Sequence, residues 1–553
     1  KSLDTRSVMK SVDSKSSGDE NGARGSVTGD TTRAAGGTLL TLGHVLTLVA
    51  LVSVVWVPAK LFLVRGAPAK AKLLLFVALA TYLAVAISIT FAFPDVRPML
   101  LGSVVGGWVV ALWRAQPRYG DSQGRPLGSL GLSSSFEALS NYDFYHNQSH
   151  RFGPIFKSNQ YFRPVLCVIG LERCQTFLRD NRDHLTSAPL PINRYISGGL
   201  LRYMETDQHR RYRRLLASCM TPRAHLGAER SNERTVRAEV SALAKTSQRG
   251  RAPGVKPFAA IDKLVYGGLI QLFFAIEPDS SRAHRMHELY RQIDHRRLWR
   301  RRTRARQAID SIVEIVRDRA SELTPEDVVL RGSFLAEAIH DDRQRVEDPI
   351  FVENLVYFLH IARCDLDGLC AWLLKMLCDH PKWALRLRQL RCDGERREDT
   401  ATSGESLADR FVKETLRLRQ SEYLYRTVAE PIKWKGFSVP AGWLVRLCIR
   451  ESHVDANVFD RPTEFDPDRF ADASFSLQQY QPFGIYEHAC MGAYVTAMFG
   501  RILVQELADR YACTTVRDGP MEPGLHHHNH WRPSSRLKVR LEPVSEARRH
   551  LRS

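Results

Sequence analysis

The chain has 553 residues, of which 44% are hydrophobic, and it carries a formal net charge of +19. This length fits one large domain with appendages, and the hydrophobic content excludes a chain that is disordered throughout. The charge favours an anionic partner, and because no nucleic-acid-binding motif occurs, we expect a membrane and no nucleic acid. Ten cysteines are scattered without a CxxC pair. They indicate a reducing compartment and argue against a disulfide framework or a zinc site.

The N-terminal region divides into a polar tail and an apolar part. Residues 1–36 are rich in Ser, Gly and Thr and are expected to form a disordered tail. Within residues 37–114, three apolar runs follow at 39–64, 73–93 and 99–113. The first two are long enough to cross a bilayer as helices, and the third either crosses or pairs as a buried hairpin partner. We therefore predict two to three transmembrane helices, with buried core helices or a signal peptide as the alternative.

The charges around these runs predict an orientation. Arg65, Lys70 and Lys72 lie in the first loop, and Arg114 and Arg118 follow the third run. Because cytoplasmic loops are enriched in Lys and Arg, both positions are expected to face the cytoplasm. The chain is thus predicted to be an integral membrane protein with its main domain, residues 115–553, on the cytoplasmic side.

The main domain shows mixed periodicity and regular turn signals. Residues 152–156 and 164–169 predict a pair of strands joined by a turn. Helical patterns run from about 351 to 378, from 407 to 418 and from 491 to about 511. We expect a mainly α domain with small β-sheets near both of its ends.

The segment around Cys490 carries the clearest chemical signal. Residues 482–492 read PFGIYEHACMG, with Phe483 seven residues before the cysteine, His488 two before it and Gly492 two after it. Because a helical pattern begins here, the thiol is placed near a helix N-terminus, where backbone N–H groups stabilise a thiolate. Taken alone, the segment also fits a small buried cysteine before a helix.

Two motifs precede this segment in a fixed order. Residues 414–417 read ETLR and place an acid and a base on one helical face, and residues 465–470 read FDPDRF. The order ExxR, PxRF, FGxxxHxCxG resembles the cytochrome P450 family over nearly all of residues 140–545. The resemblance implies a fold that cradles haem b, iron protoporphyrin IX, with Cys490 as the thiolate ligand of the iron. It also implies a charge network of Glu414, Arg417 and Arg469 under the haem-binding loop.

The resemblance further assigns cations to the haem propionates, which need charge-assisted hydrogen bonds. Arg426 and His488 match positions that contact one propionate in the family. His209 and Arg213 resemble the HxxxR of an early helix that clamps the other. His453 matches a position that is polar in many members. For each cation alone, a surface role is the alternative.

Tyr486 is one departure from the family pattern, which usually has glycine four residues before the cysteine. A residue other than glycine at positive φ costs about 1–2 kcal/mol. Either the loop is reshaped at Tyr486 or the strain is tolerated.

The distal helix is the second departure. Residues 361–366 read IARCDL, where the family has a small residue followed by an acid–Thr pair that relays protons. Cys364 lies at the acid position and Asp365 at the Thr position; shifting the alignment by one residue makes Asp365 the acid but leaves Leu366 in place of an alcohol. We name Arg363, Cys364 and Asp365 as candidate catalytic residues. Arg363 either holds a substrate carboxylate or faces solvent or another helix.

Two further clusters each fit two roles. Residues 295–306 are strongly basic, and either rest on anionic lipid or form a solvated face. Residues 526–530 read HHHNH and resemble a metal-binding tract. Because adjacent histidines along a strand point to opposite faces, we favour a polar loop that binds metal adventitiously.

These expectations combine into a haem-thiolate monooxygenase that oxidises a lipophilic, membrane-partitioned small molecule. Since no dinucleotide fingerprint occurs, electrons are expected from a separate redox partner, a reductase or ferredoxin, that docks near Cys490. One alternative is a peroxide-using or isomerase-type haem-thiolate enzyme, favoured by the missing Thr. The other is a non-catalytic haem-binding sensor or pseudoenzyme, favoured by Tyr486 and the altered distal helix.

Overall fold

The structure is a computed structural model that describes residues 124–544, apart from gaps at 131–133, 135–136, 139, 161–162, 189–198, 205, 250–253, 294–301, 325–326, 328–331, 393–403, 421–423, 473 and 523–530. The predicted tail (1–36), the predicted membrane region (37–114) and the histidine tract (526–530) lie outside the described residues. The chain divides into two compact units, and everything below concerns the second, Leu112–Ser553. No helix among the described residues combines the length and hydropathy needed to cross a membrane.

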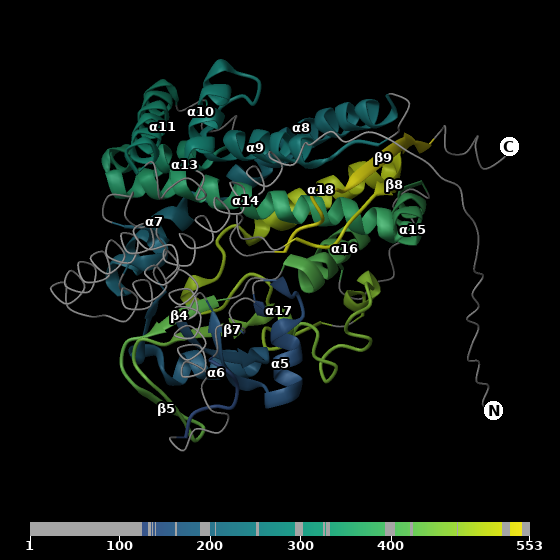
Figure 1. Ribbon diagram of the computed structural model, residues 1–553. Coiled ribbons are helices and arrows are strands. Elements are labelled where there is room, and N and C mark those ends of the chain that lie inside the picture. The colour runs from purple at the N-terminus through teal and green to yellow at the C-terminus, as the bar shows by residue number, and fades with distance from the viewer. Residues whose placement is uncertain are drawn as a thin grey trace, which may run out of the picture. The chain divides into compact units, whose positions relative to one another are not determined.

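Helices make up most of the described chain (Figure 1). They are α5 (Phe144–Phe152), α6 (Leu171–Asp180), α7 (Thr206–Ser218), α8 (Pro222–Gln248), α9 (Phe258–Phe274), α10 (Ser281–Gln292), α11 (Arg302–Glu322), α13 (Phe334–Asp341), α14 (Pro349–Asp379), α15 (Pro381–Cys392), α16 (Leu407–Thr415), α17 (Ile449–Ser452) and α18 (Ala493–Arg510). A π-helical turn, Leu416–Gln420, continues α16, and short 3₁₀ turns include η4 (Leu201–Tyr203), η7 (Pro467–Phe470) and η8 (Tyr486–His488). The expected mainly α architecture is confirmed.

The longest helix, α14, lies at the centre of the helical core. The Asp348 carboxylate caps its first turn by accepting hydrogen bonds from the backbone N–H groups of Ile350 and Phe351. Pro349 at the first position lacks the N–H that a first turn leaves unpaired anyway. Helices α9, α11, α16 and α18 pack around α14. Because neighbours cover several of its faces, α14 carries no single polar stripe to reveal its orientation.

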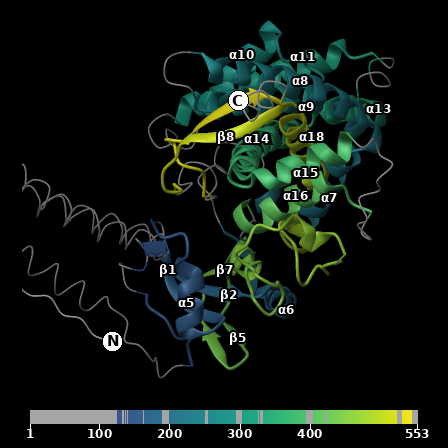
Figure 2. The same cartoon turned by 90° about the vertical axis from the view of Figure 1, so that its right-hand side faces the viewer.

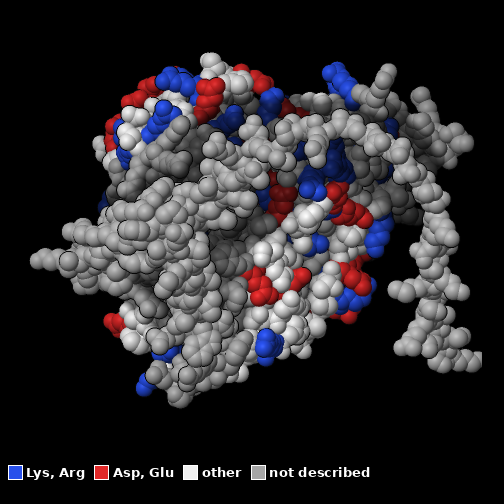
Figure 3. Space-filling view, viewed as in Figure 1, with Lys and Arg blue, Asp and Glu red and all other residues white. Residues whose placement is uncertain are grey.

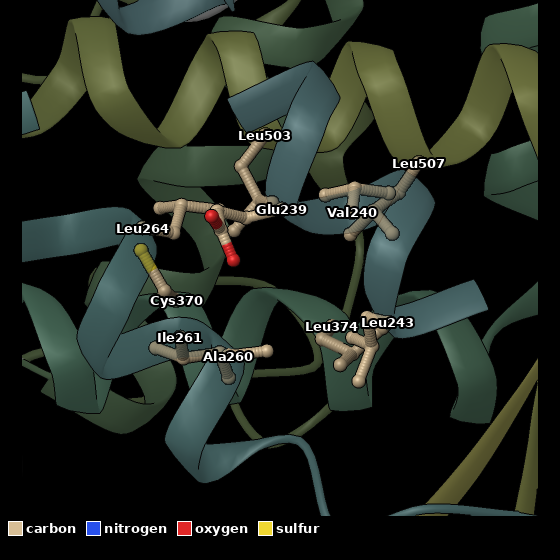
Figure 4. Close-up of a pocket in the computed structure, with 10 residues that line it drawn as sticks. All are labelled: Glu239, Val240, Leu243, Ala260, Ile261, Leu264, Cys370, Leu374, Leu503 and Leu507. Carbon is tan, nitrogen blue, oxygen red and sulfur yellow. The ribbon is translucent and has the colours of Figure 1, made fainter. Parts of the chain in front are cut away.

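Helices α8, α9, α14 and α18 pack against one another as a bundle. They line a small, partly open apolar cavity of about 10 Å³ (Figure 4), which is about the space that one water molecule needs. Half of the residues that line it are leucines, and the Glu239 carboxylate at its side forms an ion pair with Lys263 at 2.6 Å. None of the predicted site residues lines this cavity, so we read it as a packing defect of the bundle.

The main sheet has five strands in the order β1-β2-β7-β4-β3. These are β1 (Ile155–Gln160), β2 (Arg163–Ile169), β3 (Leu185–Ser187), β4 (Leu424–Val428) and β7 (Leu444–Cys448). The predicted hairpin forms as β1 and β2, and β2 pairs in parallel with β7, which brings Ile169 opposite Cys448. Helices α5 and α6 pack beside this sheet (Figure 2). Two smaller sheets pair β5 (Ile432–Trp434) with β6 (Phe437–Val439) and β8 (Tyr511–Arg517) with β9 (Lys538–Pro543).

The described end of the basic segment 295–306 lies in α11. Arg306 forms ion pairs with Asp310 at 2.6 Å and with Glu353 at 2.7 Å. On the face seen in Figure 3, Lys and Arg are interspersed with Asp and Glu over α10 and α11. Of the basic side chains described in this segment, Arg306 is therefore neutralised by its acidic partners.

Candidate functional site

Cys490 lies at the end of the loop that leads into α18. Its backbone N–H donates to the Phe483 carbonyl at 2.7 Å, which closes the loop, and Gly492 is the N-cap residue of the helix. The thiol is thus two residues from a helix N-terminus, whose unpaired N–H groups favour a thiolate. Among the cysteines whose side chains the structure describes, only Cys490 is exposed. A buried packing role for this thiol is therefore excluded.

Tyr486 shows how the loop accommodates the missing glycine. Its φ is +54°, in the left-handed region that favours glycine, and Gly484 two residues earlier has φ +85°. The Tyr486 side chain is 48% exposed, and its hydroxyl lies 3.4 Å from the Gln175 carbonyl oxygen. The loop therefore keeps its backbone path, and Tyr486 bears the strain without much packing in return.

Four predicted cations from three separate segments meet beside this loop. His209 and Arg213 lie on α7, Arg426 on β4 and His488 on η8. The rings of His209 and His488 are 4.7 Å apart between centroids. Arg213 donates to the Ala489 carbonyl, next to Cys490, at 3.0 Å. Arg426, which is 8% exposed, donates to the Tyr425 carbonyl at 2.9 Å.

The electrostatics of these cations point to an anionic ligand. Burial, followed by repulsion from Arg426 and His209, lowers the pKa of His488 to about 3. Burial and then Arg202 lower the pKa of Arg426 to about 10. The acid that offsets the cluster is Glu487, which is itself paired with Arg182 at 2.5 Å. His488 is therefore neutral, and the positive charge is that of Arg426 and Arg213. Burying such charge is costly unless a ligand supplies negative charge, and the two propionates of haem would do so. Arg202, on η4, also acts on Arg426 and His488, and no sequence motif identified it as part of this group.

Glu414, Arg417 and Arg469 form one buried network. Arg417 holds both carboxylate oxygens of Glu414 at 2.7 and 2.8 Å, and Arg469 reaches the same carboxylate at 3.1 Å. The remaining Arg417 donors go to the carbonyls of His453 at 2.6 Å, Pro462 at 2.7 Å and Glu464 at 3.2 Å. Since nearly every donor and acceptor is satisfied, the network fixes the path of the chain at this point.

His453 connects this network to the cysteine loop. It is fully buried, and its Nε2 accepts a hydrogen bond from the Gln481 backbone N–H at 3.0 Å, just before the loop begins. Burial and then the neighbouring Arg417 lower the pKa of His453 to about 3. The imidazole is therefore neutral and serves as an acceptor that anchors the loop.

The distal-helix candidates do not all face one site. Arg363 on α14 donates to the Asp262 carboxylate of α9 at 2.7 Å, and His287 of α10 lies 3.2 Å from the other carboxylate oxygen. These contacts hold the Arg363 guanidinium against a neighbouring helix. Burial, followed by Asp367 and Asp365, raises the pKa of Cys364 to about 12, so this thiol stays protonated near neutral pH.

Two polar residues beside Cys364 were not found from the sequence. Arg532, from the segment before β9, donates to the Cys364 carbonyl at 3.5 Å. Burial raises the pKa of Asp367 on α14 to about 7, and one of its carboxylate oxygens is buried without a hydrogen-bond partner among the described residues. Spacing gives no signal for this contact, because Arg532 and Cys364 are 168 residues apart.

Comparison with known proteins identifies the family. Residues 127–540 match the family model for cytochrome P450. Abscisic acid 8'-hydroxylase 3 of Oryza sativa subsp. indica is 25% identical over 413 residues, which covers 70% of this chain and 81% of that protein. Abscisic acid 8'-hydroxylase 1 of Arabidopsis thaliana is 22% identical over 428 residues, or 73% and 88% of the two chains. Cytochrome P450 26B1 of Homo sapiens is 25% identical over 418 residues, or 69% and 80%.

A solved structure shares the fold. Retinoic acid-bound cyanobacterial CYP120A1 superposes with a TM-score of 0.62 at 19% identity, covering 76% of this chain and all of that one. The family implies haem iron, and the residues present fit it. Cys490 is exposed at a helix N-terminus. Beside it lie the guanidinium groups of Arg213 and Arg426 and the imidazoles of His209 and His488, all of which can donate hydrogen bonds to propionates. The chain therefore belongs to the cytochrome P450 family and is an enzyme of the P450 monooxygenase type.

Proposed function

We propose that this enzyme hydroxylates a lipophilic carboxylic acid at haem b, with electrons from a separate redox partner. The observation that carries the proposal is the exposed Cys490 thiol with a cationic cluster beside it. When bound, thiolate-ligated haem supplies the oxygen chemistry. The chain itself supplies the Cys490 thiolate as the iron ligand, the cations for the propionates and the rigid loop that holds Cys490.

Several residues that the fold holds in place would bind the cofactor. The N–H groups at the start of α18 favour the Cys490 thiolate. Arg426 and Arg213 are in place to donate to propionate oxygens, because their backbone contacts leave other guanidinium donors available. The Glu414–Arg417 pair and His453 keep the loop from shifting.

The substrate class rests on Arg532. Arg363, the cation first considered for a carboxylate, is engaged by Asp262, and these two groups neutralise each other. Arg532 lies at Cys364 on the distal helix, facing the charges of Asp365 and Asp367. Since the pKa of Asp367 is about 7, this acid is only partly ionised near neutral pH and contributes less than a full negative charge beside Arg532. The names of the curated relatives, which hydroxylate abscisic acid, support an acidic, lipophilic substrate.

The apolar runs of residues 37–114 support a membrane-anchored enzyme with its catalytic domain on the cytoplasmic side. Such an anchor would keep the enzyme beside substrates that partition into lipid. Membership of the cytochrome P450 family, whose hydroxylases normally need a redox partner, supports a separate electron donor. Resistance of the membrane-bound chain to extraction at alkaline pH tests the anchor, and release into the supernatant would contradict it.

Abscisic acid is the probe for the first test. We expect it to shift the haem absorbance of the full-length holoprotein and to be hydroxylated with NADPH and a P450 reductase. Arg532→Gln should weaken binding about thirtyfold, the loss of a charged hydrogen bond of about 2 kcal/mol. Arg536→Gln, an exposed arginine of the same segment, is the matched control.

The methyl ester of abscisic acid separates the effect of the carboxylate charge on binding from the effect of molecular shape. It should bind wild type and Arg532→Gln equally, because it has no charge for the guanidinium to hold. An equal loss of acid and ester binding in Arg532→Gln would contradict a carboxylate site. If Arg532→Gln forms product and binds abscisic acid with the wild-type affinity, the chain is a monooxygenase, but Arg532 does not hold the substrate carboxylate.

A peroxide-using enzyme is the second candidate, favoured by Asp365 and Leu366 in place of the acid–Thr pair. Turnover supported by hydrogen peroxide without any reductase, at a rate above that of the reconstituted system, would establish it. Full haem occupancy without turnover under either condition would instead favour a haem-binding sensor.

A further inference from the structure

Two histidines on α5 face each other across one helical turn, apart from every residue assigned above. His146 and His150 are four residues apart, and their Nε2 atoms are 2.9 Å apart. The ring centroids are 4.5 Å apart, and the ring planes cross at 83°. His150 is exposed and His146 is half-buried, so solvent reaches the pair. Helix α5 packs on β1, which holds the two rings in a fixed place on the domain (Figure 2).

The separation of the two nitrogens matches one coordination geometry. A metal–imidazole bond of about 2.0–2.1 Å places two ligands in cis positions of a square plane about 2.8–3.0 Å apart, and two ligands of a tetrahedron about 3.3–3.4 Å apart. The observed 2.9 Å fits the square plane. Tetragonal sites with nitrogen and oxygen ligands are typical of Cu²⁺ and Ni²⁺, and Cu²⁺ binds such sites most tightly.

A carboxylate beside the pair favours a bound cation. Asp143 precedes α5 and makes no side-chain cap with the helix, so its exposed carboxylate is available to attract a cation. Arg450 acts in the opposite direction on His146, but less than Asp143 does. No group of three or more His, Cys, Asp or Glu side chains suited to a metal occurs in the described part of the chain, so water would complete the coordination.

We propose that His146 and His150 form a two-histidine chelate for Cu²⁺. Without metal, the same geometry is a hydrogen bond between two neutral rings, in which one Nε2–H donates to the other Nε2. On binding, the donor ring carries its proton on Nδ1 instead, so both Nε2 atoms face the metal and the neutral pair releases no proton. Protonation of either ring competes with the metal, so copper affinity falls in acid.

Isothermal titration of the full-length holoprotein with Cu²⁺ tests the proposal. The histidine tract at 526–530 is first changed to glutamine in every sample, because it would bind copper as well. We expect one site per chain. His150→Gln should weaken it about 100-fold, since the second ligand no longer binds intramolecularly. His284→Gln is the matched control, because His284 is exposed on α10 and its Nδ1 lies 2.8 Å from the Ser280 carbonyl oxygen.

Three outcomes decide the matter. Equal weakening in His146→Gln and His150→Gln, with no change in the control and with Zn²⁺ bound less tightly than Cu²⁺, supports the chelate. An affinity that is the same in His150→Gln and in the parent protein refutes it. Zn²⁺ bound more tightly than Cu²⁺ refutes the square-planar assignment. The haem absorbance of each variant reports its folding, and His150, being exposed, is the safer of the two substitutions.

Discussion

Replacing His453 with glutamine should make the stability of the holoprotein less sensitive to acid. In the fold, burial and Arg417 hold the pKa of His453 at about 3, whereas an unfolded histidine has a pKa of about 6.5. The folded state therefore favours the neutral ring. Its contribution to stability is fully present above about pH 6.5 and is lost as the pH falls below that value.

The size of the effect follows from the two pKa values. At about pH 5, His453 is protonated in the unfolded chain but not in the folded chain. The resulting free-energy difference accumulates over about 1.5 pH units below the unfolded pKa, at about 1.36 kcal/mol per unit. The penalty is about 2 kcal/mol, and no discount for solvent applies because His453 is fully buried. Glutamine keeps an acceptor oxygen for the Gln481 N–H but does not titrate.

Guanidinium unfolding of both proteins, followed by tryptophan fluorescence at about pH 7 and pH 5, measures the difference. Wild type should lose about 2 kcal/mol more than His453→Gln on acidification. His284→Gln, which removes an exposed histidine, should behave as wild type. The same acid loss in wild type and in His453→Gln would show that this imidazole is not held neutral by the fold.

Two further substitutions test the loop and its support. Glu414→Gln should lower the free energy of unfolding by about 3–5 kcal/mol and reduce haem content, because it leaves the buried Arg417 and Arg469 without their counter-charge; an unchanged denaturation midpoint would contradict this. Tyr486→Gly should raise the free energy of unfolding by about 0.5–1 kcal/mol, since relief of left-handed strain exceeds the added chain entropy. Tyr486→Ala keeps the strain and should show no gain, so equal stability of the two variants would refute the strain argument.

The cysteine loop and the Glu414–Arg417 pair could be predicted from the sequence because their geometry is local, whereas Arg469, 55 residues after Glu414, could be assigned to the network only through the family resemblance. The residues around Cys490 are fixed by a run of eleven positions and by the start of one helix. The Glu414–Arg417 pair follows from the pitch of a single helix. Such relations need no knowledge of how distant segments pack.

Contacts between distant segments could not be predicted in this way. The direction of Arg363 depends on Asp262, 101 residues earlier, and α14 is packed on several faces, so its periodicity gives no orientation. The parallel pairing of β2 with β7 joins Val165 to Leu444, and no turn signal marks it. Arg532 and Arg202 likewise reach the site from segments that carry no motif of their own.

The most direct test of the account is the absorbance difference spectrum of the dithionite-reduced holoprotein with carbon monoxide. The account predicts a Soret band shifted strongly to the red of that of a histidine-ligated haem, and its loss in Cys490→Ala. A band at the position of a histidine-ligated haem, or a red-shifted band that persists in Cys490→Ala, would contradict thiolate ligation by Cys490.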